Sequence, residues 1–171
     1  MTMINLEELA KFLVKAKKGT YAGDGRELTP ERPGFKELEF SDGDWVYRDS
    51  YVGFFRAPGQ EVVRFQGEPV WTMSYDGGML PGYREDVAFA KETFGFLKKA
   101  LLLVPEYAPF RGPGKFEEHS GGIRWIYKTL LENILHSLTD FHGRETISIY
   151  DGTVTKNVFA QRYMGGLVIP K

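Results

Sequence analysis

The feature that most constrains this fold is an internal repeat. Short motifs occur twice in the same order along the 171-residue chain. A shared motif order indicates two copies of one folding unit, because several chance matches would not keep the same order. We therefore predict an α+β fold made by tandem duplication, with pseudo-two-fold symmetry between residues 1–82 and 83–171, packed together as one globular unit. The paired segments are 12–22 and 96–108, 32–35 and 112–116, 45–48 and 125–128, Phe55 and Phe141, 59–61 and 143–145, and 75–79 and 163–167.

Each copy is predicted to begin with an amphipathic helix. Asn5 and Glu8 have the spacing of a capping box, and apolar side chains then recur at helical intervals until Gly19. The second helix is predicted to start near Tyr83 and to end before Pro105, because proline cannot continue a helix.

Alternating apolar and polar residues follow each helix after a loop rich in glycine and proline. The period of two predicts strands over 45–55, 61–65 and 71–75 in the first copy. The dipeptide 151–152, Asp-Gly, is a strong hairpin signal in the second copy. Each unit is therefore expected to hold one helix and three or four antiparallel strands.

A glycine pair closes each copy, at 77–78 and at 165–166. Glycine adopts positive φ without steric cost, so we expect each pair to mark the point where the final strand leaves the sheet.

The segment 123–138 supports two interpretations. Its apolar residues fit a helical stripe, whereas alignment with the first copy favours a strand, at least over 125–129. We predict a strand followed by an insertion.

Composition and charge narrow the function classes. The 22 basic and 23 acidic side chains give a net charge of −1, and the basic residues are scattered, so no nucleic-acid partner is expected. The absence of cysteine mildly favours the cytoplasm. The longest apolar run, 100–105, is far too short to cross a bilayer, so no membrane association is expected.

Motifs of familiar chemistry are absent from the sequence. The histidines lack metal-ligand spacing, no serine lies in a nucleophile elbow, and no complete dinucleotide fingerprint occurs. We predict no metal and no cofactor, and the sequence leaves open whether the protein is an enzyme.

Glu61 and its counterpart Glu145 are the most informative candidate residues. Both share strand parity with apolar neighbours and should point toward the core, where a carboxylate must be hydrogen-bonded or paired. In one interpretation they accept backbone N–H bonds from the adjacent glycine-rich turn. In the other they face a ligand or act as acid or base.

Asp49 shares a face with aromatic residues, and its counterpart is Thr129. Such asymmetry is what a binding site on one half would produce, although an edge-strand aspartate in solvent is the alternative. Arg111, in the loop before the second sheet, is either a solvated loop residue or a partner for an acid or an anion.

Trp71, Met73 and Tyr75 form a stripe that suits either a core or a pocket wall. The counterpart of Met73 is Gln161, and that of Tyr75 is Tyr163, so one copy has a more polar surface here. Aromatic walls with one or two acids suit a flat or cationic small ligand.

Several of these motifs resemble a prokaryotic family catalogued only as a domain of unknown function. The motifs lie at 21–23, 71–77, 111–113, 141–145 and 163–166. Members of that family occur alone or C-terminal to XRE-type helix-turn-helix domains, which implies an effector or sensor role in some relatives. Few residues precede the first helix here, so we expect no DNA-reading module, and the resemblance brings no catalytic residues.

Three functional hypotheses follow. The first is a small-molecule-binding or sensory domain, with the ligand held between the inner faces of the two sheets. The alternatives are an enzyme with Glu61 or Asp49 as general base, and a structural or protein-interaction domain. The partners left open are a small-molecule ligand and a second copy in a homodimer. The candidate ligand contacts are Asp49, Glu61, Trp71, Met73, Tyr75, Arg111, Glu145 and Tyr163.

Overall fold

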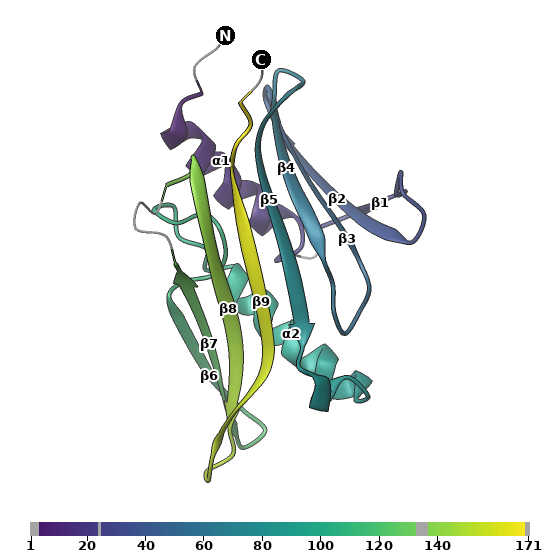
Figure 1. Ribbon diagram of the computed structural model, residues 1–171, viewed down its shortest axis with the longest axis vertical. Helices are drawn as coiled ribbons and strands as arrows, with labels where there is room; N and C mark the ends of the chain where they lie inside the picture. The colour runs from purple at the N-terminus through teal and green to yellow at the C-terminus, as the bar shows by residue number, and fades with distance from the viewer. Residues whose placement is uncertain (1–3, 24, 133–136, 170–171) are drawn as a thin grey trace.

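The computed structural model describes residues 4–23, 25–132 and 137–169. Within these residues the fold is α+β, with two α-helices, a short 3-10 helix and nine strands in one open antiparallel sheet (Figure 1). The strand order is β1-β2-β3-β4-β5-β9-β8-β7-β6. The elements are α1 Leu6–Gly19, β1 Glu27–Leu28, β2 Phe35–Asp42, β3 Trp45–Val52, β4 Gly59–Phe65, β5 Glu68–Met79, η1 Pro81–Tyr83, α2 Val87–Leu101, β6 Lys115–Ser120, β7 Ile123–Leu131, β8 Asp140–Tyr150 and β9 Thr155–Leu167.

Helix α1 begins and ends as the sequence predicts. The Asn5 side chain accepts hydrogen bonds from the backbone N–H groups of Glu7 (3.0 Å) and Glu8 (3.3 Å). These bonds satisfy donors that a helix N-terminus otherwise leaves unpaired.

Helix α2 begins at Val87, so the predicted start near Tyr83 is wrong. The Asp86 side chain caps this helix by accepting from the Phe89 N–H (2.9 Å). The residues before it form the short helix η1 instead.

The central strands β5 and β9 join the two halves of the chain side by side. They pair antiparallel, with Tyr75 opposite Tyr163 and Met79 opposite Phe159. Strands from both halves of the chain therefore form one continuous sheet. Both helices lie on the same face of this sheet (Figure 1). A ligand site between two facing sheets, as the sequence suggested, is not what this arrangement provides.

The segment 123–131 is strand β7, which pairs with β6 and β8. The strand predicted over 125–129 is confirmed. Residues 133–136, where the predicted insertion falls, lie outside the described residues.

The glycine pairs at 77–78 and 165–166 lie one residue before the ends of β5 and β9, and positive φ occurs at 77–78 but not at 165–166. Both pairs remain inside the β5–β9 ladder. The glycines also allow close packing: at Gly78, where φ is +147°, a Cβ would lie 2.2 Å from the backbone oxygen of Phe55. No residue with a side chain fits there without displacing backbone.

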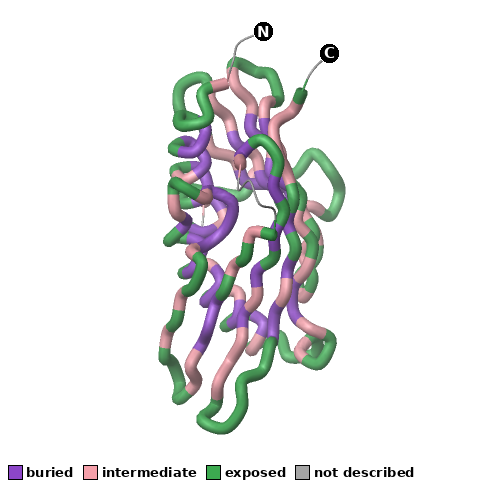
Figure 2. Tube along the Cα trace, turned by 60° about the vertical axis from the view of Figure 1, so that its left-hand side comes forward, coloured by how far each residue is buried: buried purple, intermediate pink, exposed green. Residues whose placement is uncertain are grey.

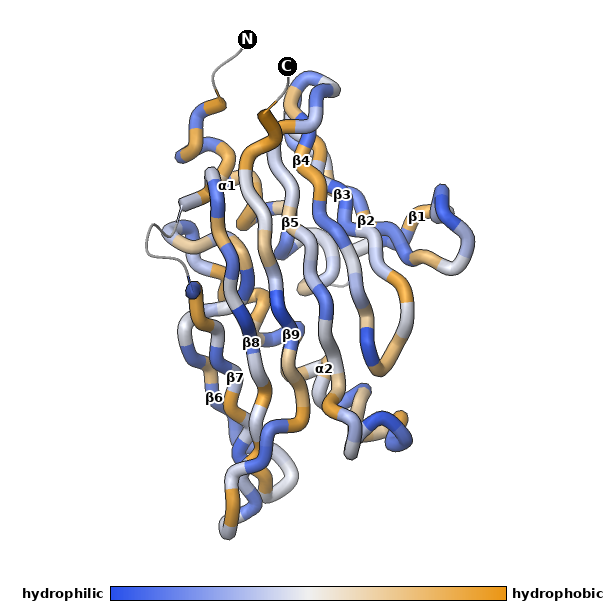
Figure 3. Tube along the Cα trace, viewed as in Figure 1, coloured by the Kyte–Doolittle hydropathy of each residue, from blue (hydrophilic) through white to orange (hydrophobic). Residues whose placement is uncertain are grey.

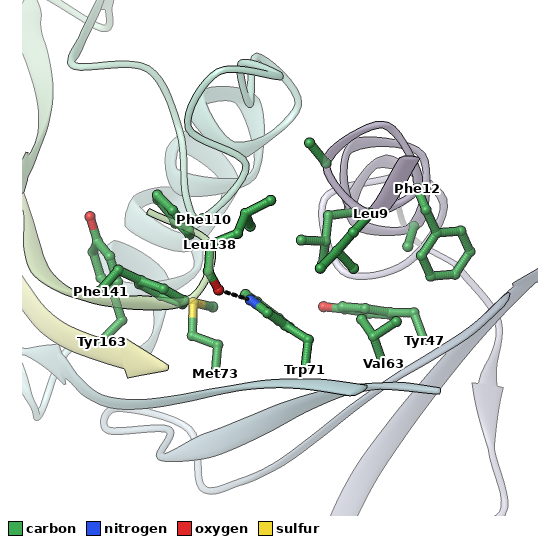
Figure 4. Packing of buried hydrophobic residues seen from close by; sticks show 13 residues of the cluster. Leu9, Phe12, Tyr47, Val63, Trp71, Met73, Phe110, Leu138, Phe141 and Tyr163 are labelled. Carbon is green, nitrogen blue, oxygen red and sulfur yellow. Dashed lines mark hydrogen bonds between the residues drawn. The ribbon is translucent and has the colours of Figure 1, made fainter. Parts of the chain in front are cut away.

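The core consists of two clusters on the inner face of the sheet, one under each helix. In the cluster under α1, Leu9 and Phe12 pack over Tyr47, and the Trp71 indole donates to the Leu138 carbonyl (3.2 Å; Figure 4). Buried segments concentrate in the helices and the middle of the strands, whereas the turns are exposed (Figure 2).

Polar and apolar residues alternate along the strands, as expected for a sheet with one covered face (Figure 3). In the described part of the chain, no helix has both the length and the apolar character needed to cross a membrane.

Candidate functional site

A pocket lies between the inner face of the sheet and the two helices. We call it the central pocket. The C-terminal end of α1, strands β3, β5 and β9, and the middle of α2 all contribute to its walls. Its aromatic lining consists of Tyr21, Tyr47, Tyr51, Tyr75, Phe94, Phe110 and Phe159.

Five charged side chains are buried at or beside this pocket, and we call them the buried charge cluster. They are three acids and two bases, and none is more than 8% exposed. Burying a charge is costly unless it is paired, so the partners of each one define the site. The members are Lys17, Asp49, Glu61, Arg111 and Glu145.

Lys17 and Glu61 form the first buried ion pair, which joins α1 to β4. The Lys17 ammonium donates to Glu61 Oε2. Burial lowers the pKa of Lys17 from its ordinary value, although the charge of Glu61 opposes that shift. Arg111 adds a longer contact to the other Glu61 oxygen, at 3.8 Å.

Arg111 and Glu145 form the second pair. The guanidinium donates twice to Glu145 Oε1, from Nε at 3.0 Å and from Nη2 at 2.7 Å. Tyr127 donates to Glu145 Oε2 at 2.7 Å and itself accepts from the Gly112 N–H. Burial opposes the Arg111 charge, but Glu145, together with Tyr127 and Glu61, raises the pKa of Arg111 well above its ordinary value. Glu145 therefore has a complete set of partners.

Asp49 differs from the other two acids. It accepts a hydrogen bond from the Tyr75 hydroxyl at 2.7 Å, but it forms no ion pair with any Lys or Arg among the described residues. Burial, together with repulsion from Glu61, raises the pKa of Asp49 to about 7. It is the carboxyl group in the cluster without a cationic partner.

Gln161 is the second incomplete group. It lies opposite Glu145 on β9, lines the central pocket and is 6% exposed. Its side-chain Nε2 has no hydrogen-bond partner in the described part of the protein. A buried amide donor normally has a partner, so this group is suited to receive one from a ligand.

The eight candidate residues from the sequence fall into three places. Asp49, Glu61, Tyr75 and Arg111 line the central pocket, and Glu145 lies behind Arg111. Trp71 and Met73 are fully buried in the core under α1 (Figure 4). Tyr163 lines a smaller pocket, where its hydroxyl is 3.0 Å from that of Thr129.

Two of the structural alternatives weighed from the sequence are wrong. Glu61 and Glu145 are bonded by side chains rather than by the backbone of a glycine turn. Asp49 is 4% exposed and does not reach solvent.

Lys17 is the site residue that sequence reasoning missed. It belongs to the basic residues that are scattered along the sequence, yet it is 7% exposed and lines the pocket. It follows Leu13 by four residues, so it lies on the buried stripe of α1. A lysine that continues an apolar stripe was the available signal.

A metal site is not formed by the described residues, because no three His, Cys, Asp or Glu side chains come together there in a suitable arrangement. The buried charge cluster instead combines carboxylates with Lys and Arg side chains, an arrangement suited to hydrogen bonding and to the recognition of charged groups.

Comparison with known proteins identified one family. A family model described as a domain of unknown function, DUF5680, matches residues 49–168, which span parts of both halves of the chain. No curated protein and no solved structure matches the chain significantly.

Proposed function

The chain belongs to the DUF5680 family, and from the geometry of its central pocket we propose that it is a small-molecule-binding domain with a sensory role. The observation that carries this proposal is the pairing of an aromatic-walled pocket with two incomplete polar groups, the Asp49 carboxyl and the Gln161 amide.

The lining of the pocket supports a small-molecule ligand. Ligand pockets typically have apolar walls with a few placed polar groups. The central pocket has this composition. The neighbouring pairs Lys17–Glu61 and Arg111–Glu145 are complete, so they hold the walls in place while Asp49 and Gln161 remain free to bind.

We also propose that residues 1–82 and 83–171 are two versions of one unit, with the pocket between them. Three features support this. Apart from β1, which has no counterpart, the strand order is symmetric about the β5–β9 pair, and the matched residues Tyr75 and Tyr163 lie opposite each other. Asp49 lies opposite Glu61, as Thr129 lies opposite Glu145. The position of Asp49 in the first half is then occupied by Thr129 in the second half. The unpaired carboxyl group would therefore occur in the first half alone.

A thermal-shift screen against a metabolite library tests the binding proposal. The matched variants are Ala57→Trp, at a partly buried position that lines the pocket, and Ala88→Trp, at an exposed position of α2 away from it. We expect at least one compound to raise Tm by about 5–10 °C at roughly 100 times its Kd, in the parent and in Ala88→Trp. The shift should be lost in Ala57→Trp.

A compound that stabilises Ala57→Trp equally would bind elsewhere and contradict the proposal. If no compound raises Tm, the structural or protein-interaction alternative is favoured.

One observation supports an enzymatic role as the second candidate. A carboxyl group whose pKa is about 7, bonded to the Tyr75 hydroxyl in a pocket, suits general acid–base chemistry. Asp49 replaces Glu61 as the favoured base, because Glu61 is already paired with Lys17. Mass spectrometry of each binding compound after incubation tests this role: a product formed by the parent but not by Asp49→Asn supports it, and unchanged compounds contradict it.

A further inference from the structure

We infer that the ligand of the central pocket is a small monocation with a flat apolar body, and that its positive group binds Asp49. This inference rests on the proposed binding function and adds the chemical class of the ligand.

The charge balance of the buried cluster is the first argument. Three carboxyl groups face two basic groups, and each base is already bonded to a glutamate. A cation placed at Asp49 completes a third pair. An anion would add a fourth negative group to a site of low dielectric constant, where repulsion is strong.

The surroundings of Asp49 are the second argument. Tyr47 and Tyr51 flank it on the same face of β3, and Tyr75 bonds to it from β5. The Tyr21 ring packs edge-on against Tyr51, with 5.9 Å between ring centroids. Aromatic faces around a carboxylate attract a cation through their quadrupoles and also cover its apolar body.

The opposite wall supplies the second contact. Gln161 lies directly across from Gly77 in the β5–β9 ladder, and Gly77 and Gly78 also line the pocket. At these glycines the wall beside Gln161 is formed by backbone. An acceptor at the far end of the ligand would satisfy the unpaired Gln161 Nε2.

Binding should be linked to protonation of Asp49. Burial and Glu61 raise its pKa to about 7, so below that pH a cation must displace a proton to form the pair. Affinity should therefore fall about tenfold between about pH 8 and about pH 6, and level off above the pKa. The titratable and charged groups that face Asp49 are Lys17 of α1, Tyr21 after α1, Tyr47 and Tyr51 of β3, Glu61 of β4, Tyr75 of β5 and Arg111 of the loop after α2.

Isothermal titration calorimetry of the full chain with size-matched probes tests the inference. The probes are benzamidine, benzamide and benzoate, which are cationic, neutral and anionic versions of one planar shape. We expect benzamidine to bind at least about tenfold more tightly than benzamide at about pH 8, with benzoate weakest. Asp49→Asn should lose both this preference and the pH dependence, whereas Asp42→Asn, at an exposed position of β2, should keep both.

The outcomes separate this inference from the binding proposal. If benzamide or benzoate binds as tightly as benzamidine, or if Asp49→Asn keeps the preference, the pocket binds ligands but not cations at Asp49. If none of the probes binds at concentrations of about 1 mM, the inferred ligand class is wrong. The metabolite screen with Ala57→Trp then decides the binding proposal on its own.

Discussion

Replacing Asp49 with Asn should make the protein more stable at neutral and alkaline pH. The substitution removes a buried carboxyl group that has no cationic partner among the described residues. It keeps an oxygen that can accept the hydrogen bond from Tyr75. A stability gain from losing a polar interaction group is typical of residues retained for function.

The size and sign of this gain follow from the pKa of Asp49. Its ordinary value is 3.8, and burial followed by repulsion from Glu61 raises it to about 7 in the folded state. The folded protein therefore holds a proton that the unfolded chain has lost, so stability falls as pH rises between these two values. The full difference corresponds to about 4 kcal/mol above pH 7, and it vanishes below about pH 4.

Urea unfolding, followed by tryptophan fluorescence, measures this difference across the pH range. Asp151→Asn is the contrasting variant. The Thr153 hydroxyl, together with the N–H groups of Thr153 and Val154, holds the pKa of Asp151 below its ordinary value. That variant should lose stability above about pH 4, the opposite sign. The reasoning fails if Asp49→Asn is no more stable than the parent at about pH 8, or if its advantage persists unchanged into acid.

Three further substitutions test the structure, each by urea unfolding. Arg111→Met should lower the free energy of unfolding by about 3–5 kcal/mol, because it leaves Glu145 buried without a cation. Adding Glu145→Gln should recover part of that loss. If the effects of the two substitutions simply add, the two side chains are not paired. Asn5→Ala should cost about 1 kcal/mol through loss of the α1 cap, and an unchanged midpoint would show that the cap is not formed. Gly78→Ala should cost at least about 2 kcal/mol, since its Cβ would clash with the Phe55 carbonyl; tolerance of alanine would argue against this close approach.

Local patterns in the sequence predicted much of the inner face. The cap at Asn5 and the strand alternation depend on neighbouring residues, so they can be identified without knowing the fold. Strand parity correctly directed Glu61 and Glu145 to the buried side, and it also put Asp49 beside aromatic residues. These residues are the acidic half of the buried charge cluster.

The basic half of the cluster was harder to predict. Lys17 continues an apolar stripe, but lysine is so often exposed that this pattern alone does not predict a buried charge. Arg111 lies in a loop, where no period shows which way a side chain points. Its contact with Glu145 depends on how that loop packs against the sheet.

The arrangement of the two halves could not be predicted from local sequence patterns either. Alternation shows which face of a strand is buried, but not which strand edges will pair. The β5–β9 ladder joins Tyr75 to Tyr163, far apart in the chain. This pairing decides that the pocket lies between the sheet and the helices rather than between two sheets.

The same ladder has a consequence for a chain that is still being synthesised. Strand β5 spans 12 residues. Its edge away from β4 is paired with the 13-residue strand β9, which comes much later in the sequence. Until β9 emerges, that edge offers a row of unpaired amide and carbonyl groups, a template for another β-strand. A truncated chain ending at residue 82 should self-associate through this edge, with one β5 aligned against another. Emergence and pairing of β9 would then be the step that protects β5 from such aggregation.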